Sequence, residues 1–232
     1  GDGNNSTFYG NGGNDTFFGS LGSDTFYGGS APLNDTIDYS AATGNVTLNV
    51  NGGSASSSDF GSDAFSGIEY FKTGSGDDTF IAVDAGTDTF DAGGGTNFLD
   101  YSAASNAITI DLAGGSATGV NIGTDLFSGF QKVALGNGQD KITGTSGDDT
   151  FVGNGGADTF FGGAGNDTFS GDGGADVLDY SASTVDMAID LTGVSGSGSV
   201  TGTGFGTDIV SNIQVVLTGT GDDVYEGSAQ AN

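Results

Sequence analysis

Apolar and polar positions between Leu135 and Asp179 repeat every nine residues. Five units follow one another: LGNGQDKIT, GTSGDDTFV, GNGGADTFF, GGAGNDTFS and GDGGADVLD, each with Gly at position 4, Asp at position 6 and an apolar residue at position 8. A period of nine fits no helix, and one unit is too short to bury a core alone. We therefore expect each unit to form one turn and one short strand, stacked so that neighbours cover each other.

Two units would make one coil of 18 residues, so that units i and i+2 lie on the same side of the stack. Neighbouring strands would then lie about 4.8 Å apart. The apolar side chain at position 8 would point into a thin core, and positions 7 and 9 would point outward. The pattern therefore predicts an all-β stack without helices.

Nonapeptide tracts alternate with three longer units along the whole chain. Each longer unit begins with Asp-Tyr-Ser, continues into an alternating strand pattern, and then passes a loop rich in Gly, Ser and Thr, a turn with Asp and a second apolar segment. We expect each longer unit to be one widened coil of a single continuous stack over 1–232. Because the chain starts on one unit and stops inside another, we also expect it to be part of a longer polypeptide. The tracts cover 1–37, 73–99, 135–178 and 218–232, and the widened coils cover 38–72, 100–134 and 179–217.

Stacking places the position-6 carboxylates of successive coils next to each other, where they repel unless a cation lies between them. Calcium takes six to eight oxygens at about 2.3–2.6 Å, which two aspartates and the carbonyls of two glycine-rich turns can supply. We expect the strongest sites at the pairs Asp140–Asp158, Asp149–Asp167 and Asp158–Asp176, and a further site at Asp15–Asp35. Asp24 would stack on Ser6 and Asp78 on Asn97, which predicts weaker or unfilled sites there.

The candidate ligands also include one turn aspartate from each widened coil, for which capping of its own backbone is the alternative interpretation. The carbonyl ligands would come from glycines of the five-unit tract. The full set is Asp15, Asp24, Asp35, Asp63, Asp78, Asp88, Asp125, Asp140, Asp149, Asp158, Asp167, Asp176, Asp208 and Asp223, with the carbonyls of Gly144, Gly147, Gly153, Gly155, Gly162, Gly163, Gly171 and Gly173.

The charge of the chain narrows its function classes. The chain contains thirty acidic residues and only three lysines, which gives a net charge of -27, and its 47 glycines favour tight turns. This balance excludes nucleic acid and anionic membranes as partners, and no apolar run approaches the roughly 20 residues of a membrane span. The absence of Cys, His and Arg removes disulfides, thiolate sites and most acid–base chemistry, so we expect no catalysis in this chain.

The units resemble the haemolysin-type calcium-binding repeat of the RTX family, whose pattern is G-G-x-G-x-D-x-U-x. GGAGNDTFS at 162–170 and GNGGADTFF at 153–161 match it closely, and the Asp-Tyr-Ser units are similar to the segment that precedes the repeats of serralysin-like proteases. The resemblance implies a right-handed parallel β-roll that binds several Ca²⁺ ions. It also implies export of the parent protein by type I secretion machinery, and folding outside the cell, in the extracellular medium or on the bacterial surface.

Two alternatives to a passive calcium-binding scaffold remain. The chain could be a segment of a cell-surface lattice protein or adhesin, with self-association or cell-surface polysaccharide as its partner. Aromatic residues at the outward position 9 (Tyr9, Phe18, Tyr27 and Phe161) favour this interpretation unless neighbouring coils cover them. The chain could also be a non-catalytic C-terminal module of a secreted protease, lipase or alginate epimerase.

Overall fold

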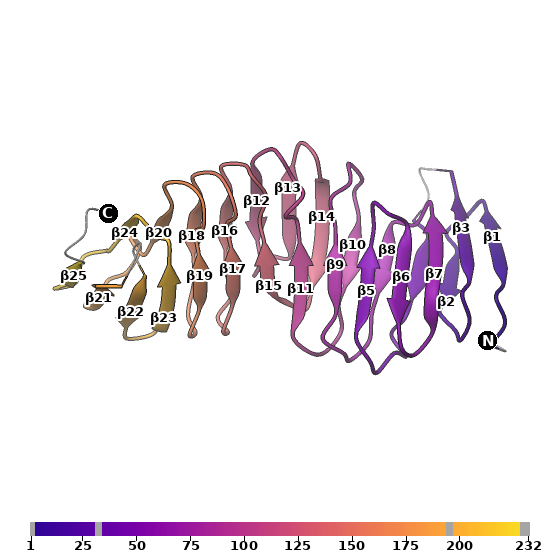
Figure 1. The fold of residues 1–232 in the computed structure, drawn as a ribbon, viewed down its shortest axis with the longest axis horizontal. Helices are drawn as coiled ribbons and strands as arrows, with labels where there is room; N and C mark the ends of the chain where they lie inside the picture. Colours follow the sequence, from indigo (N-terminus) through magenta and orange to yellow (C-terminus); the bar gives the residue numbers. More distant parts are fainter. Residues whose placement is uncertain (1–2, 31–33, 194–196, 228–232) are drawn as a thin grey trace. The chain divides into compact units, whose positions relative to one another are not determined.

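The computed structural model describes residues 3–30, 34–193 and 197–227. Every regular element in these ranges is a β-strand, and most strands are three to five residues long (Figure 1). Residues 1–2 and 31–33 of the first tract, residues 228–232 of the last tract and residues 194–196 of the third widened coil lie outside the described ranges. The all-β prediction is confirmed for the described part of the chain.

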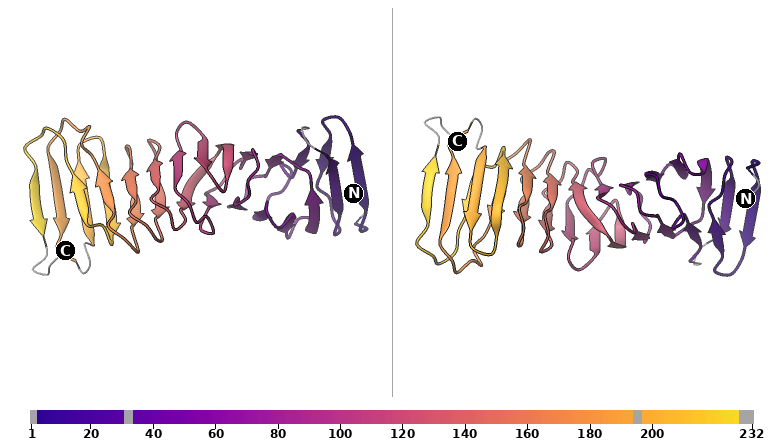
Figure 2. Two further views of the ribbon diagram at one scale, coloured as in Figure 1. Left: turned by 90° about the horizontal axis from the view of Figure 1, so that it is seen from above. Right: turned by 90° about the horizontal axis from the view of Figure 1, so that it is seen from below.

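The chain divides into two compact units, each of which consists of two sheets. The first unit comprises residues 1–100 and 121–130, and the second comprises residues 101–120 and 131–232. In the first unit the strand order is β1-β3-β7-β6-β5-β9-β11 in one sheet and β2-β4-β8-β10-β14 in the other. In the second unit it is β15-β17-β19-β23-β22-β21-β25 and β13-β12-β16-β18-β20-β24 (Figure 2).

The strands of the first unit are β1 (Thr7–Asn11), β2 (Thr16–Phe18), β3 (Thr25–Gly29), β4 (Thr36–Asp38), β5 (Val46–Asn49), β6 (Ser54–Ser57), β7 (Gly61–Ser66), β8 (Tyr70–Lys72), β9 (Thr79–Ile81), β10 (Thr89–Asp91), β11 (Asn97–Asp100) and β14 (Gly123–Ser128). Those of the second unit are β12 (Ile108–Asp111), β13 (Ser116–Gly119), β15 (Phe130–Ala134), β16 (Lys141–Thr143), β17 (Thr150–Val152), β18 (Thr159–Phe161), β19 (Thr168–Ser170), β20 (Val177–Asp179), β21 (Met187–Leu191), β22 (Gly198–Gly202), β23 (Gly206–Ser211), β24 (Val215–Leu217) and β25 (Val224–Gly227).

The five-unit tract forms a parallel β-roll with the expected 18-residue coil. Strands β16, β18 and β20 pair in parallel in one sheet, and β17 pairs with β19 in the other. The register matches position 8 of each unit with position 8 two units later, as in Ile142 with Phe160 and Phe151 with Phe169. These side chains are fully buried, whereas positions 7 and 9 of the same strands are mostly half-buried. The predicted inward and outward positions are therefore confirmed here.

The widened coils differ from the prediction in one respect: their Gly/Ser/Thr-rich loops contain strands. In the first unit β6 pairs antiparallel with β5 and with β7, and in the second unit β22 pairs antiparallel with β21 and with β23. Likewise, Asp63, Asp125 and Asp208 lie inside β7, β14 and β23 and not in a turn. The turn comes just before these strands, and their first residues, Gly61, Gly123 and Gly206, have positive φ values that favour glycine.

Several aromatic side chains stay exposed at the outermost strands. Phe8 on β1 is 42% exposed although it occupies the inward position, because β1 has a neighbouring strand on one side only. The outward residues Tyr9 and Phe18 are 66% and 69% exposed, and the Tyr9 ring stacks on that of Tyr27 with 4.9 Å between centroids. Phe161 is half-buried and carries the Lys141 ammonium over its ring. Neighbouring coils therefore do not cover this outward row at β1–β3.

Within the described ranges the structure contains no helix that could cross a membrane.

Candidate metal centre

The position-6 aspartates form columns that are linked by hydrogen bonds to the main chain. The Asp140 N–H donates to Asp158 Oδ1 at 2.8 Å, and the Asp158 N–H donates to Asp176 Oδ1 at 2.9 Å. In the neighbouring column the Asp149 N–H donates to Asp167 Oδ1 at 2.9 Å. The three pairs stack as expected, but a cation is not the sole link between their carboxylates. One carboxylate oxygen of the later aspartate already accepts this hydrogen bond, so the second oxygen is the one left for a cation.

The same contact places the remaining candidate aspartates. Asp15 and Asp35 stack as predicted, and so do Ser6 with Asp24 and Asp78 with Asn97. Residues of the widened coils also take part in these columns, as the first or as the last residue of a row of stacked hydrogen bonds. The other donor–acceptor pairs are Asp24 to Asp63, Asp88 to Asp125, Asp167 to Asp208, Val46 to Asp78, Ile108 to Asp140 and Met187 to Asp223.

The second carboxylate oxygen of many column aspartates is buried without a hydrogen-bond partner in the described structure. A buried oxygen without a donor costs free energy, so a cluster of such atoms indicates that a ligand belongs there. The column aspartates with such an oxygen include Asp15, Asp78, Asp88, Asp149, Asp158, Asp167 and Asp176.

Burial shifts the protonation of these groups. Loss of solvent, together with the charges of neighbouring aspartates, raises the pKa of Asp158 and of Asp167 to about 7. Burial also raises the pKa values of Asp140, Asp149 and Asp176. Backbone hydrogen bonds oppose the shift in each case. A divalent cation beside these carboxylates would restore their charged form at neutral pH.

Glycine at position 1 of a unit leaves the space that the unpartnered oxygen faces. A methyl group on Gly153 would lie 2.6 Å from Asp158 Oδ2 and 2.8 Å from the Gly171 carbonyl oxygen. The same holds for Gly171, where a methyl group would meet the Asn212 carbonyl oxygen at 2.3 Å and the unpartnered Asp176 Oδ2 at 2.4 Å. Carboxylate and carbonyl oxygens therefore converge on a gap that only glycine leaves open.

The other predicted carbonyls lie in the same turns. The Gly147 oxygen faces position 4 of the next coil, Gly165, and the Gly173 oxygen accepts the Gly156 N–H at 2.8 Å. Gly155 forms a bridge with Gly173, whereas Gly163 has φ +103° and lies against the Thr145 carbonyl. The Gly173 carbonyl thus has a protein partner already.

Asn97 shows within the same molecule what occupies this gap when the carboxylate is missing. It is fully buried, and its Oδ1 accepts the Asp78 N–H as the aspartates do. Its Nδ2 donates to the carbonyls of Ala92 and Gly94 in its own turn and of Gly129, at 3.2, 3.2 and 2.8 Å. Several carbonyls thus converge on the second side-chain atom. An aspartate there would bring a negative oxygen to carbonyl oxygens, which a cation must hold together.

Two of the predicted ligands accept hydrogen bonds at both carboxylate oxygens. Asp63 Oδ2 accepts the Tyr39 hydroxyl at 2.9 Å, and Asp208 Oδ2 accepts the Tyr180 hydroxyl. Both oxygens of these junction aspartates are therefore used by the protein, and we leave the two residues out of the calcium set proposed below. One oxygen of each accepts the N–H of an earlier coil and the other accepts a tyrosine hydroxyl.

Two further predicted ligands also have both oxygens hydrogen-bonded. Asp24 accepts the Ser6 N–H and the Ser20 hydroxyl, and Asp140 accepts the N–H groups of Ile108 and Gly136. The sequence predicts a weak calcium site at Asp24, because Asp24 stacks on Ser6. It predicts a strong site at Asp140, whose second carboxylate oxygen accepts the Gly136 N–H at 3.2 Å.

Two residues in the aspartate slots are absent from the sequence-based set. Glu69 Oε2 accepts the Asp35 N–H at 2.9 Å, and Gln214 Oε1 accepts the Asp176 N–H at 2.6 Å. Each precedes a short strand of a widened coil as the aspartates precede theirs. Alignment of Glu69-Tyr70-Phe71 with Asp88-Thr89-Phe90 would have been a signal for Glu69, since these strands pair in register.

In the described ranges, no three acidic side chains come together closely enough to hold a metal ion by themselves. The donor set that fits is one or two carboxylates with main-chain carbonyls, all hard oxygen ligands of the kind calcium prefers.

Comparison with protein families identifies these turns. The model of the RTX calcium-binding nonapeptide repeat matches residues 1–31, 63–99, 135–169 and 143–178. The chain therefore carries copies of the RTX calcium-binding nonapeptide repeat, which makes it a calcium-binding repeat module. A search of curated proteins finds no significant match to the chain.

Proposed function

We propose that this chain is a calcium-dependent folding module of a larger secreted bacterial protein. Ca²⁺ would bind at the column aspartates whose second oxygen is buried and unpartnered, chiefly Asp149, Asp158, Asp167 and Asp176 in the five-unit tract and Asp15, Asp78 and Asp88 elsewhere. Asp35, Asp125, Asp140 and Asp223 would contribute as stacked neighbours, with carbonyls of Gly144, Gly153, Gly155, Gly162 and Gly171.

The unpartnered carboxylate oxygens carry this proposal, because they make the folded state unfavourable without a cation. The net charge of -27 adds self-repulsion to the compact chain. At low calcium the chain would therefore stay largely unfolded, and calcium binding would supply the free energy of folding. A calcium-poor cytosol and a calcium-rich exterior would then set where it folds.

A calcium titration followed by far-ultraviolet circular dichroism tests the proposal. We expect little strand signal in a chelator and a cooperative gain of strand signal as calcium is added. Magnesium at the same concentration should be less effective, since it requires near-ideal octahedral geometry and gives up its water reluctantly. Equal folding in the chelator, or with magnesium, would contradict the proposal.

The type I secretion machinery and an extracellular or cell-surface location follow from the same proposal. They apply to the parent protein, which we propose to contain this chain as one continuous roll. A catalytic domain such as a protease, lipase or alginate epimerase would lie elsewhere in the parent.

Self-association at the cell surface is a second candidate function, favoured by the exposed aromatic row of Tyr9, Phe18 and Tyr27. Exposed stacked rings are unusual on a protein that has no contact partner, and they suit a second copy or a surface polysaccharide. Electron microscopy of the calcium-loaded chain distinguishes the two candidates. Ordered sheets or filaments would support assembly, whereas dispersed monomers would support the module alone.

A further inference from the structure

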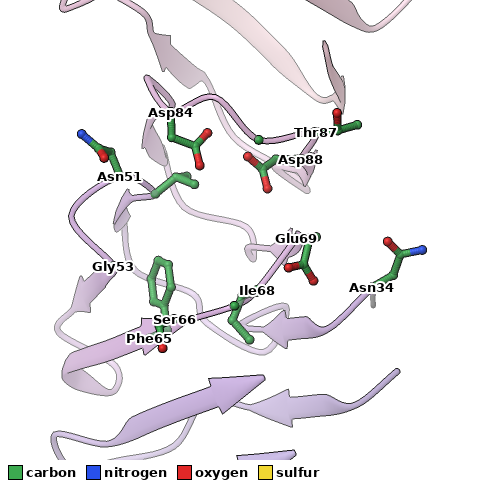
Figure 3. A pocket seen from close by; sticks show the side chains of 13 residues that line it. Asn34, Asn51, Gly53, Phe65, Ser66, Ile68, Glu69, Asp84, Thr87 and Asp88 are labelled. Carbon is green, nitrogen blue, oxygen red and sulfur yellow. The ribbon is translucent and has the colours of Figure 1, made fainter. Parts of the chain in front are cut away.

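The longest acidic column of the first unit opens into a cavity. Successive slots of this column hold Asp15, Asp35, Glu69, Asp88 and Asp125. A cavity of about 710 Å³ lies beside it, with Glu69, Asp84 and Asp88 in its wall (Figure 3). Its described lining includes no basic residue.

The hydrogen-bond chain of the column is interrupted at this cavity. In the five-unit tract each aspartate receives the N–H of the previous slot. Asp88 should therefore receive the N–H of Glu69. That N–H instead donates to the Asp35 carbonyl at 3.1 Å, together with the N–H of Tyr70 at 2.9 Å. Asp88 is 97% buried, and its Oδ2 has no partner in the described structure.

A second carboxylate reaches the same place from an irregular part of the repeat. The unit that ends in β10 carries one additional residue, and Asp84 lies in that enlarged turn. Oδ1 of Asp84 is also buried without a partner. In Figure 3 the Asp84 and Asp88 side chains are neighbours on one wall of the cavity, with Glu69 on the facing segment.

Gly86 lies between the two carboxylates and leaves a gap next to them. A methyl group on Gly86 would lie 2.9 Å from Asp88 Oδ2 and 3.2 Å from Asp84 Oδ2. Two unpartnered carboxylates thus border one small space at the cavity wall. Two anions so placed need either a shared proton or a cation.

We propose that Asp84 and Asp88 together hold a divalent cation, calcium under extracellular conditions, at the wall of this cavity. The inference rests on the proposed function, since it assumes that the column aspartates bind cations. The proposed site differs from the other column sites because Asp84 supplies a second side-chain ligand at a position where the nonapeptide pattern has none. Because the site faces a cavity, water completes the coordination of the ion, and Glu69 adds negative charge from the opposite side.

The number of calcium ions bound per chain tests the proposal when it is measured by equilibrium dialysis on the whole chain. We expect Asp84→Asn to lose one bound ion, or to bind it at least about tenfold more weakly, because affinity depends on the number of charged ligands. Asp38→Asn is the matched control in the same unit. It removes the same charge, and its amide oxygen can still accept the Ser40 N–H.

Terbium luminescence lifetimes in H₂O and D₂O provide a second measurement, because they count the water molecules on the bound ion. The wild-type chain should contain a water-rich component that Asp84→Asn lacks and Asp38→Asn retains. If Asp84→Asn fails to fold in calcium, the variant Gly86→Ala tests the same cation site. It keeps both carboxylates, places a methyl group in the gap and should also remove the water-rich component.

An unchanged calcium number and affinity in Asp84→Asn, with an unchanged terbium signal, would overturn the proposal and leave the aspartate pair sharing a proton. The proposed function would survive that result, because the other columns would still bind calcium. Failure of the wild-type chain to bind calcium anywhere would instead overturn the proposed function.

Discussion

Replacing Asp158 by Asn should reduce the calcium dependence of folding and raise the stability of the calcium-free chain. Asp158 is fully buried, its Oδ1 accepts the Asp140 N–H, and its Oδ2 has no partner in the described structure. An asparagine keeps the Oδ1 contact. Its Nδ2 could then donate to carbonyls of its turn, as Asn97 donates to Ala92 and Gly94.

The size of the effect follows from the pKa of Asp158. Burial raises this pKa from 3.8 to about 7. Each unit corresponds to 1.36 kcal/mol, so keeping the group ionised at pH 8 without calcium costs at most about 4 kcal/mol. Asparagine removes that cost. With calcium at about 100 times its Kd, one bound ion contributes about 2.7 kcal/mol, which the variant loses.

Chemical unfolding at pH 8, once with a chelator and once with saturating calcium, measures both changes. We expect Asp158→Asn to be more stable than the wild type in the chelator, and we expect this advantage to shrink by about 2.7 kcal/mol in calcium, because the variant loses one bound ion. Asp190→Asn is the control in the same unit, because Asp190 is exposed and accepts the Thr192 N–H, a contact that the amide oxygen preserves. We expect it to change neither condition by more than a few tenths of a kcal/mol.

Equal destabilisation of Asp158→Asn in the chelator and in calcium would refute the reasoning. In that case the unpartnered oxygen would have a structural partner that the charge argument overlooks. If Asp158→Asn is less stable than the wild type in calcium but not more stable in the chelator, only the comparison with Asn97 is refuted.

Three further outcomes test other parts of the structure. Asn97→Asp should add one calcium ion per chain and destabilise the calcium-free chain, as measured by dialysis and by unfolding in a chelator; an unchanged ion number would contradict the role of the Asn97 amide. In the chelator, the free energy of unfolding should fall as pH rises from about 4 to about 8, because the pKa values of Asp158 and Asp167 lie near 7 in the folded chain and near 3.8 when unfolded. Their contribution is complete below the unfolded value and disappears above the folded one; a rise in stability over this range would refute it. Tyr180→Phe should lower the free energy of unfolding by about 1–3 kcal/mol with or without calcium, because it leaves Asp208 Oδ2 buried without a donor, whereas exposed Tyr27→Phe should have no such effect.

The nine-residue register was sufficient to predict the paired strands β16–β20 and the stacking of their aspartates. A side-chain period of two fixes which residues face the core, and an 18-residue coil fixes which units meet. Both depend on local pattern alone. The prediction therefore succeeds where every unit has the same length.

The parts that were missed depend on contacts between distant residues. Ser54–Ser57 has no alternating apolar pattern, and it becomes a strand because β5 and β7 pair with it from both sides. The hydroxyl of Tyr39 reaches Asp63, 24 residues away, which no nonapeptide rule encodes. Glu69 fills an aspartate slot with a side chain one methylene longer, and a search for Asp alone overlooks it.

The tyrosines of the Asp-Tyr-Ser units limit how far negative charge can accumulate. A column of stacked carboxylates becomes more costly with every anion added, because each new charge raises the pKa values of its neighbours. Asp208 accepts a tyrosine hydroxyl, Gln214 places a neutral amide in the slot after Asp176, and the Met187 N–H donates to Asp223 in a further column. A roll of this type can therefore be lengthened by repeating tract and widened coil together, whereas lengthening a tract alone would exhaust what its ions can neutralise.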